Sequence, residues 1–314
     1  MAPKMKPFVF TDFSGLEPLS TTFCRSHSSF FVETPVIILP PTIDVPITGI
    51  THNGQPVQFA AHFERRETGF IADIAVESVE SEPSSKFAEF YLNLMLDVAS
   101  LRHASPFQIL MNSGEDKKRI IPSTSGIMQQ EDFDQAARIA FLYYTWENDL
   151  TRSISWYRKG LSSPDPLLSF LGLWNSIEIL ASKFCEKNAK TEGDGKTKNQ
   201  IHQAFLDYLK ESRSEFFADD DEMHEWIKEN HKMRLDIAHG LASSDLNTYR
   251  RNEVLIPKIR KIATTFVRLV ADARRTENEK MKCIIEQANQ QAAQRRKEAT
   301  EAARKTNVED QQSR

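Results

Sequence analysis

The chain has 314 residues, 40% of them hydrophobic, which is enough for two domains that each bury a core. Its 40 basic and 44 acidic side chains give a formal net charge of −4. A chain with this charge does not attract nucleic acid through its overall charge, so any contact with RNA or DNA must come from a local group of basic residues.

The cysteines and the N-terminal residues indicate where the chain resides. Cys24, Cys185 and Cys283 are far apart and show no metal-ligand spacing, so we expect reduced thiols and neither a metal nor a cofactor. The first residues are basic, but no apolar stretch of secretory length follows them. No run approaches the ~20 apolar residues of a membrane span. The sequence therefore predicts a cytoplasmic protein that does not enter a membrane.

Residues 1–126 are predicted to form a mixed α+β domain, whose role and ligand the sequence leaves open. Short β-branched and aromatic runs broken by proline and glycine predict strands, most clearly over residues 30–32, 36–39 and 70–76. Apolar residues between Ser84 and Leu101 recur at intervals of three and four, which predicts a helix packed on the sheet. Residues 64–67 are predicted as an exposed turn, and residues 122–126 as a linker.

Residues 127–275 are predicted to form an all-α bundle, so the fold class is α+β. Asp165 and Pro166 mark a helix start, and this helix is apolar on most sides, which predicts a central position. Gly240 is expected just after the end of a later helix. Residues 188–199 are predicted as a loop, and residues 276–314 as a charged tail that is helical or disordered. Helices are predicted over residues 131–161, 165–180, 201–209, 219–239 and 255–269.

The helix that ends near His239 carries the predicted functional residues. Arg234 and His239 lie roughly 140° apart around an ideal helix, but a long arginine and a histidine at the helix end can still converge. Asp236, three residues before His239, can orient its imidazole. A histidine beside a permanent cation suits attack of an RNA 2′-hydroxyl on the neighbouring phosphate without a metal. The histidine would move protons, and the arginine would stabilise the phosphoryl oxygens.

The spacing of Arg234 and His239 arises by chance in a chain of this composition, so its context gives it weight. The run LWNSIEIL at residues 173–180, a variable insert and the run RLDIAHG at residues 234–240 resemble the HEPN superfamily, particularly its Apea-like branch. The resemblance covers residues 131–270. It implies a metal-independent endoribonuclease whose RX4-6H motif consists of Arg234 and His239. Supporting roles are implied for Glu178, which would hold Arg234 or line the cleft, and for Asn175 and Asp236.

The same resemblance implies partners and a biological setting. HEPN ribonucleases are usually homodimers in which two copies share a cleft, and such families act in phage defence or stress responses. RNA and a second copy of the chain are therefore the expected partners, and an antitoxin or sensor is a further one that the sequence does not identify. Leu235 departs from the family, because active members usually have a polar residue there. An inactive RNA-binding or dimerisation module is thus the alternative.

Two further sets of residues keep two interpretations. Trp156 and Tyr157, next to Arg152 and Arg158, could stack RNA bases, although aromatic residues at helical spacing more often belong to a core. His224 and His231 lie seven residues apart on one helix, which is too far for joint ligation of a metal. They are predicted to be surface or interface histidines.

Overall fold

The computed structural model describes residues 24–52, 55–78, 84–110, 126–193, 195–239 and 255–277. The chain divides into two compact units, residues 1–267 and residues 268–314. In the second unit, residues 268–277 are helical. Every residue of the predicted site belongs to the first unit.

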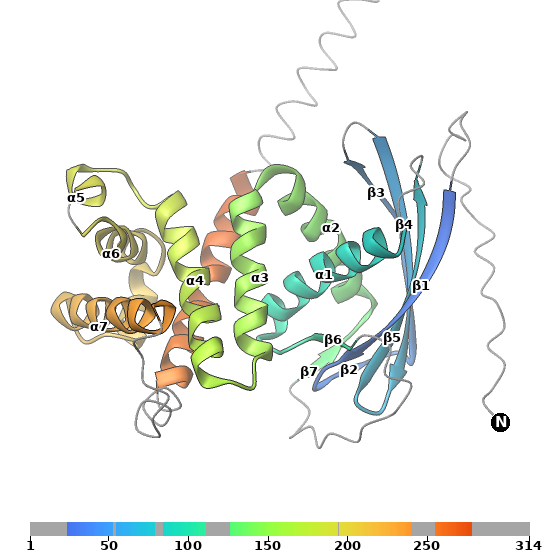
Figure 1. Ribbon diagram of the computed structural model, residues 1–314, viewed down its shortest axis with the longest axis horizontal. Helices are drawn as coiled ribbons and strands as arrows, with labels where there is room; N and C mark the ends of the chain where they lie inside the picture. The colour runs from blue at the N-terminus through green and yellow to red at the C-terminus, as the bar shows by residue number, and fades with distance from the viewer. Residues whose placement is uncertain are drawn as a thin grey trace, which may run out of the picture. The chain divides into compact units, whose positions relative to one another are not determined.

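A five-stranded antiparallel sheet opens the first unit (Figure 1). Between β4 (Gln55–Arg66) and β5 (Gly69–Ser78) the chain turns at residues 67–68. Gly69 follows with a φ of +154°, and a Cβ there would lie 1.9 Å from the carbonyl oxygen of Val32, so only glycine fits. A separate parallel pair consists of β2 (Val36–Ile38) and β7 (Gly126–Met128). In spatial order the large sheet contains β3 (Thr42–His52), β4 (Gln55–Arg66), β5 (Gly69–Ser78), β1 (Cys24–Glu33) and β6 (Gln108–Leu110).

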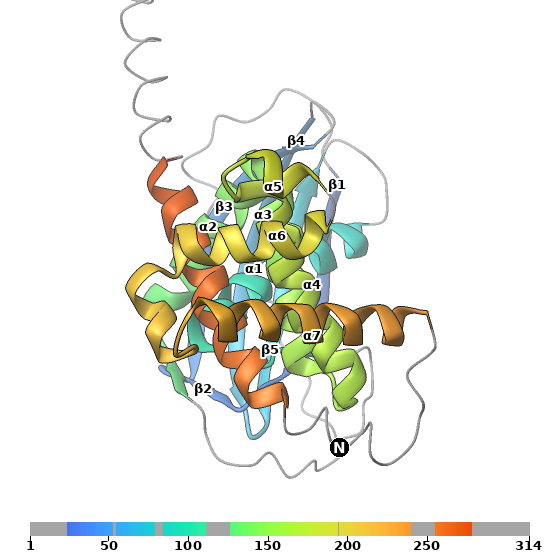
Figure 2. The same ribbon diagram turned by 90° about the vertical axis from the view of Figure 1, so that its left-hand side faces the viewer.

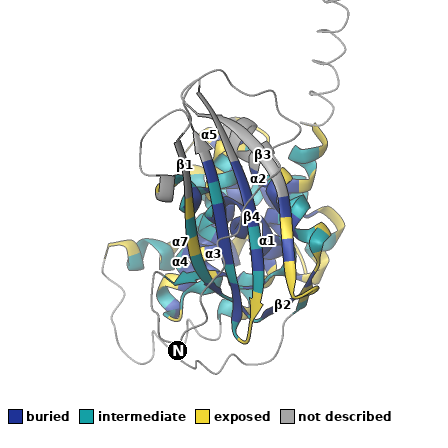
Figure 3. Ribbon diagram, turned by 90° about the vertical axis from the view of Figure 1, so that its right-hand side faces the viewer, coloured by how far each residue is buried: buried dark blue, intermediate teal, exposed yellow. Residues whose placement is uncertain are grey.

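On one face of this sheet packs α1 (Ser84–His103), which lies between the strands and the other helices in Figure 1. Along each strand, residues that point toward α1 alternate with residues that point outward. Figure 3 shows the outward face of the sheet. Tyr91 of α1 stacks on Phe59 of β4, with ring centroids 4.5 Å apart. The helix predicted from Ser84 is thus confirmed, and so is the α+β class.

The core of the sheet continues into α2 (Gln130–Trp146). Phe133 and Ala137 of α2 are buried in the same cluster as the sheet residues, and the rings of Phe133 and Phe63 lie 4.4 Å apart. Residues on both sides of position 126 therefore share one core. The division into domains at this position stays a prediction.

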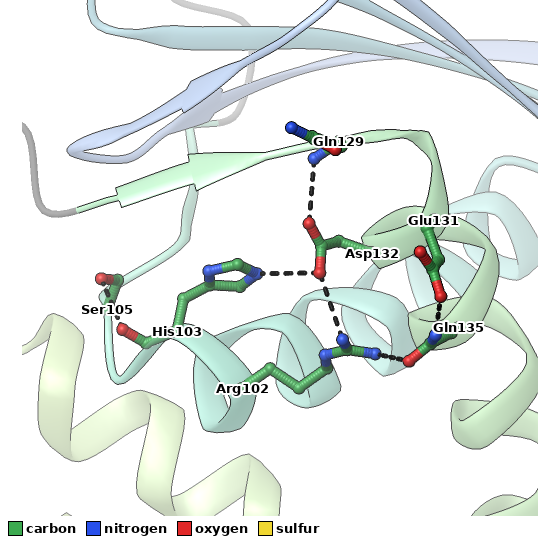
Figure 4. A network of polar contacts seen from close by, with 7 residues as sticks. All are labelled: Arg102, His103, Ser105, Gln129, Glu131, Asp132 and Gln135. Atoms are coloured by element: carbon green, nitrogen blue, oxygen red, sulfur yellow. Dashed lines mark hydrogen bonds and ion pairs between the residues drawn. The ribbon is translucent and has the colours of Figure 1, made fainter.

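Two polar networks also cross position 126. In the first, the Asp132 carboxylate accepts hydrogen bonds from Arg102 at 3.2 Å and from the Gln129 backbone at 2.9 Å, and His103 lies 3.7 Å from it (Figure 4). This network ties the end of α1 to the start of α2.

The second network is buried and ties α1 to α3 (Asn148–Ser162). The Arg158 guanidinium donates to Asp97 at 2.5 Å, to Asn93 at 2.5 Å and to the carbonyl of Phe107 at 3.1 Å. Arg158 and Asp97 are 9% and 4% exposed, so the ion pair has little access to water. The two charges are therefore compensated mainly by each other and by the hydrogen bonds to Asn93 and Phe107.

Helix α4 (Pro166–Phe184) is central as predicted, and α3 and two later helices pack against it. Its start is capped by the Asp165 carboxylate, which accepts from the backbone N–H of Leu167 at 2.8 Å. Helices α3 and α4 touch through their backbones, because a Cβ on Gly172 would lie 2.5 Å from Gly160. Across α4 lie α6 (Lys196–Tyr208) and α7 (Asp220–Ala238), side by side in Figure 2. In the chain, α5 (Ala189–Glu192) lies between α4 and α6, and a 3-10 helix (Lys210–Glu215) lies between α6 and α7.

Several predicted boundaries are wrong. The helix predicted over residues 131–161 is broken at Glu147, whose φ of −138° and ψ of 65° are not helical. Residues 64–66, predicted as a turn, end β4, and the loop predicted over residues 188–199 contains α5 and the start of α6. Of the predicted linker only Gly126 is described, and it begins β7. None of the described helices is both long and apolar enough to cross a membrane. Residues 278–314 of the predicted tail lie outside the described residues.

Candidate functional site

Helix α7 is fixed at its start by a reciprocal cap. The Asp219 carboxylate accepts from the backbone N–H of Glu222 at 2.8 Å, and the Glu222 carboxylate accepts from the backbone N–H of Ala218 at 2.6 Å. The bond from Ala218, and then the ion pair with Lys258, lower the pKa of the exposed Glu222 carboxyl. From this start the helix runs as one piece to Ala238.

A buried stripe on α7 positions Arg234. Met223, Trp226, Ile227 and Asn230 are buried at helical spacing, and the Trp226 ring lies 5.8 Å from that of Trp174 on α4. Arg234 follows Asn230 by four residues and therefore lies on the same face. The stripe thus directs Arg234 toward α4.

On α4, Glu178 meets this arginine. The Arg234 Nε lies 3.3 Å from a carboxylate oxygen of Glu178, and the two side chains are 29% and 21% exposed. Both of these atoms are buried, and neither makes a hydrogen bond within the described part of the chain. The two groups are therefore paired by charge, without a well-formed hydrogen bond between these two atoms.

The ion pair borders a pocket of about 300 Å³ whose walls come from four helices. Three of the predicted site residues, Asn175, Glu178 and Arg234, line it. One wall belongs to α3 and includes Arg152 and Trp156, whereas their neighbours Tyr157 and Arg158 are buried in the core. The lining residues are Arg152, Trp156, Asn175, Glu178, Ile179, Ser182, Thr197 and Arg234.

The predicted catalytic histidine lies elsewhere. His239 is the exposed C-cap residue of α7, where its backbone N–H donates to the carbonyls of Leu235 and Ile237, and it does not line the pocket. Leu235 and Asp236 are half-buried on the last turn. Gly240, the expected helix stop, lies outside the described residues. Within one chain, the structure brings Arg234 together with Glu178 and Asn175 but leaves His239 outside the pocket.

A different histidine lies close to the ion pair. His231 precedes Arg234 by three residues on α7, and its Nδ1 is buried without a hydrogen bond among the described residues. Burial lowers the pKa of His231 below its ordinary 6.5, Glu178 opposes this shift, and Lys198 and Arg234 add to it. Burial therefore favours the neutral form of this imidazole. The three-residue spacing from Arg234 was the sequence signal for this neighbour. His224 packs instead on His202, with ring centroids 5.7 Å apart.

Among the described residues, no group of three or more His, Cys, Asp or Glu side chains could hold a metal ion. Cys185 is a buried free thiol. Comparisons of the chain with protein-family models, with curated proteins and with solved structures find no match. The resemblance to the HEPN superfamily therefore stays a prediction from the sequence.

Proposed function

We propose that the chain is a HEPN-like, metal-independent endoribonuclease. The observation that carries this proposal is the position of Arg234, whose guanidinium lies in a polar pocket next to Glu178 and Asn175. A guanidinium presents a planar fork of donors that matches phosphate oxygens, and it stays charged at any physiological pH. This group suits the charge that develops on the scissile phosphate.

In the proposed reaction, the RNA supplies its own nucleophile. The 2′-oxygen attacks the adjacent phosphorus, the bond from phosphorus to the 5′-oxygen breaks, and a base and an acid move one proton each. The products are a 2′,3′-cyclic phosphate and a 5′-hydroxyl. His239 is the proposed proton-transfer group. Because His239 does not line the pocket of its own chain, the proposal includes a homodimer in which one copy brings its helix end to the pocket of the other.

The second candidate is a non-catalytic module that binds RNA. Two observations favour it over catalysis: Arg234 is already paired with Glu178 of its own chain, and Leu235 provides no polar group beside His239. Under this candidate, the pocket binds RNA, and the strands remain intact.

Cleavage of end-labelled RNA in excess EDTA tests the proposal. We expect the wild type to produce 2′,3′-cyclic phosphate ends, and Arg234→Ala and His239→Ala to lose about 100-fold or more of this activity. Lys228→Ala is the matched control, since it removes a positive charge from α7 at a side chain 58% exposed. Binding of RNA without cleavage would favour the non-catalytic module. Equal cleavage by His239→Ala would refute its assigned role.

A further inference from the structure

Helix α3 carries two arginines and two aromatic residues, and one arginine and one aromatic residue lie on each of two sides of the helix. Arg152 and Trp156, four residues apart, line the pocket. Tyr157 and Arg158 point into the core, where the Tyr157 hydroxyl bonds Thr264 at 2.7 Å and Arg158 pairs with Asp97. Only Arg152 and Trp156 are thus placed to contact a ligand.

These two residues add a different chemistry to the pocket. Trp156 is half-buried and contributes an aromatic ring, and Ile179 adds apolar surface. The Arg152 side chain is 61% exposed and lies 3.6 Å from Asp149, a long and solvated contact, so a stronger anion can displace it. The pocket therefore combines an aromatic wall with two guanidinium groups.

The other lining groups suit a nucleobase. The amide of Asn175 offers both a donor and an acceptor, which is what the edge of a base requires. Ser182 of α4 and Thr197 of α6 add two hydroxyl groups to the lining. The volume of about 300 Å³ lies at the lower end of the range for small-ligand sites, roughly 300–1,000 Å³. One nucleotide fits such a space, whereas a helical duplex does not enter it.

We propose that this pocket holds one unpaired nucleotide of single-stranded RNA, with the base against Trp156 and a phosphate between Arg152 and Arg234. The inference rests on the proposed function and names its substrate class. In a duplex each base is stacked and paired, so its face is not available to a side chain, whereas a single strand can splay a base out. Trp156 and Asn175 would then determine which RNA is accepted, and Arg234 would act on the phosphate.

Binding of fluorescently labelled, 2′-O-methylated oligonucleotides, which cannot be cleaved, tests this inference. We expect the single strand to bind at least about 10-fold more tightly than the same sequence in a duplex. Trp156→Ala should weaken single-strand binding about 10-fold, whereas Trp156→Phe should retain it within about 3-fold, because base stacking needs only an aromatic ring. Arg152→Ala, at an exposed side chain that should not affect folding, should weaken binding of every sequence, and Lys228→Ala should not.

Equal affinity for single strand and duplex, or unchanged affinity in both Trp156→Ala and Arg152→Ala, would overturn the inference. A free nucleoside monophosphate that binds as tightly as the oligonucleotide would also overturn it, in favour of a small-molecule site. The EDTA cleavage assay separates the two proposals. Cleavage that is indifferent to Trp156→Ala would contradict the inference and leave the ribonuclease standing. Binding that depends on Trp156 without any cleavage would contradict the ribonuclease and support the binding site.

Discussion

Replacing Asp97 with alanine should destabilise the first unit strongly. The Arg158 guanidinium would keep its bonds to Asn93 and to the Phe107 carbonyl but would lose its counter-charge, at side chains only 11% and 6% exposed. Removing one partner of such a buried pair costs about 3–5 kcal/mol, because the remaining charge stays desolvated. The double variant Asp97→Leu/Arg158→Met removes both charges, and we expect it to recover most of this loss.

Urea unfolding followed by circular dichroism measures the effect, with thermal unfolding as a check. Glu225→Ala is the matched control, because Glu225 and Lys228 form an exposed ion pair at 3.1 Å and its loss should cost less than about 1 kcal/mol. A loss below about 1 kcal/mol for Asp97→Ala would refute the assignment of a buried, mutually dependent pair. Two separate unfolding transitions in the wild type would refute the view that α1 and α3 stabilise one cooperative core.

Three more predictions concern helix contacts and pH. Burial lowers the pKa of His231 in the folded chain, so the unfolded chain takes up a proton first and the free energy of unfolding should fall as the pH drops below 6.5. In urea titrations between pH 7.5 and 5.5, His231→Asn should show a smaller fall than the wild type. An identical fall would contradict the lowered pKa. Gly172→Ala should lower the free energy of unfolding by about 1–3 kcal/mol, because the added Cβ would lie 2.5 Å from Gly160. In the control Gly126→Ala the nearest atom lies at 3.9 Å, so the melting temperature should stay within about 2 °C of the wild type. Equal melting temperatures of the two variants would count against the close crossing of α3 and α4. Asp219→Ala should cost about 1 kcal/mol through the lost cap of α7, measured by urea unfolding, and no change would show that the cap contributes nothing.

The sheet was only partly predictable from the sequence. Strands with β-branched and aromatic runs, such as β5, were clear, but neither β3 nor β4 was singled out, and in β3 Pro46 interrupts the pattern. Proline is tolerated there because β3 is an edge strand and its pairing with β4 shifts register between Val45 and Thr48. The break at Glu147 was also missed, since apolar periodicity continues from α2 into α3, and periodicity does not report the φ of one residue.

Parts of the candidate site that lie on one helix, or that the family resemblance implies, could be predicted from the sequence. Contacts that depend on tertiary packing alone could not. The pairing of Arg234 with Glu178 was expected from the resemblance, and the ion pair at 3.3 Å agrees with it. The separation of His239 from the pocket depends on where α7 ends. The inclusion of Trp156 depends on how α3 crosses α4, which one-dimensional spacing does not encode.

The glycine crossing of α3 and α4 has a consequence for binding kinetics. Trp156 lies one turn before Gly160, and Asn175 lies one turn after Gly172, so backbone contact fixes the gap between these two walls of the pocket. A gap set by backbone does not close or widen when side chains change rotamer. A ligand therefore meets walls that are already in place and loses little time to rearrangement. We expect association to follow encounter directly, so that variants of the lining side chains alter residence time far more than association rate.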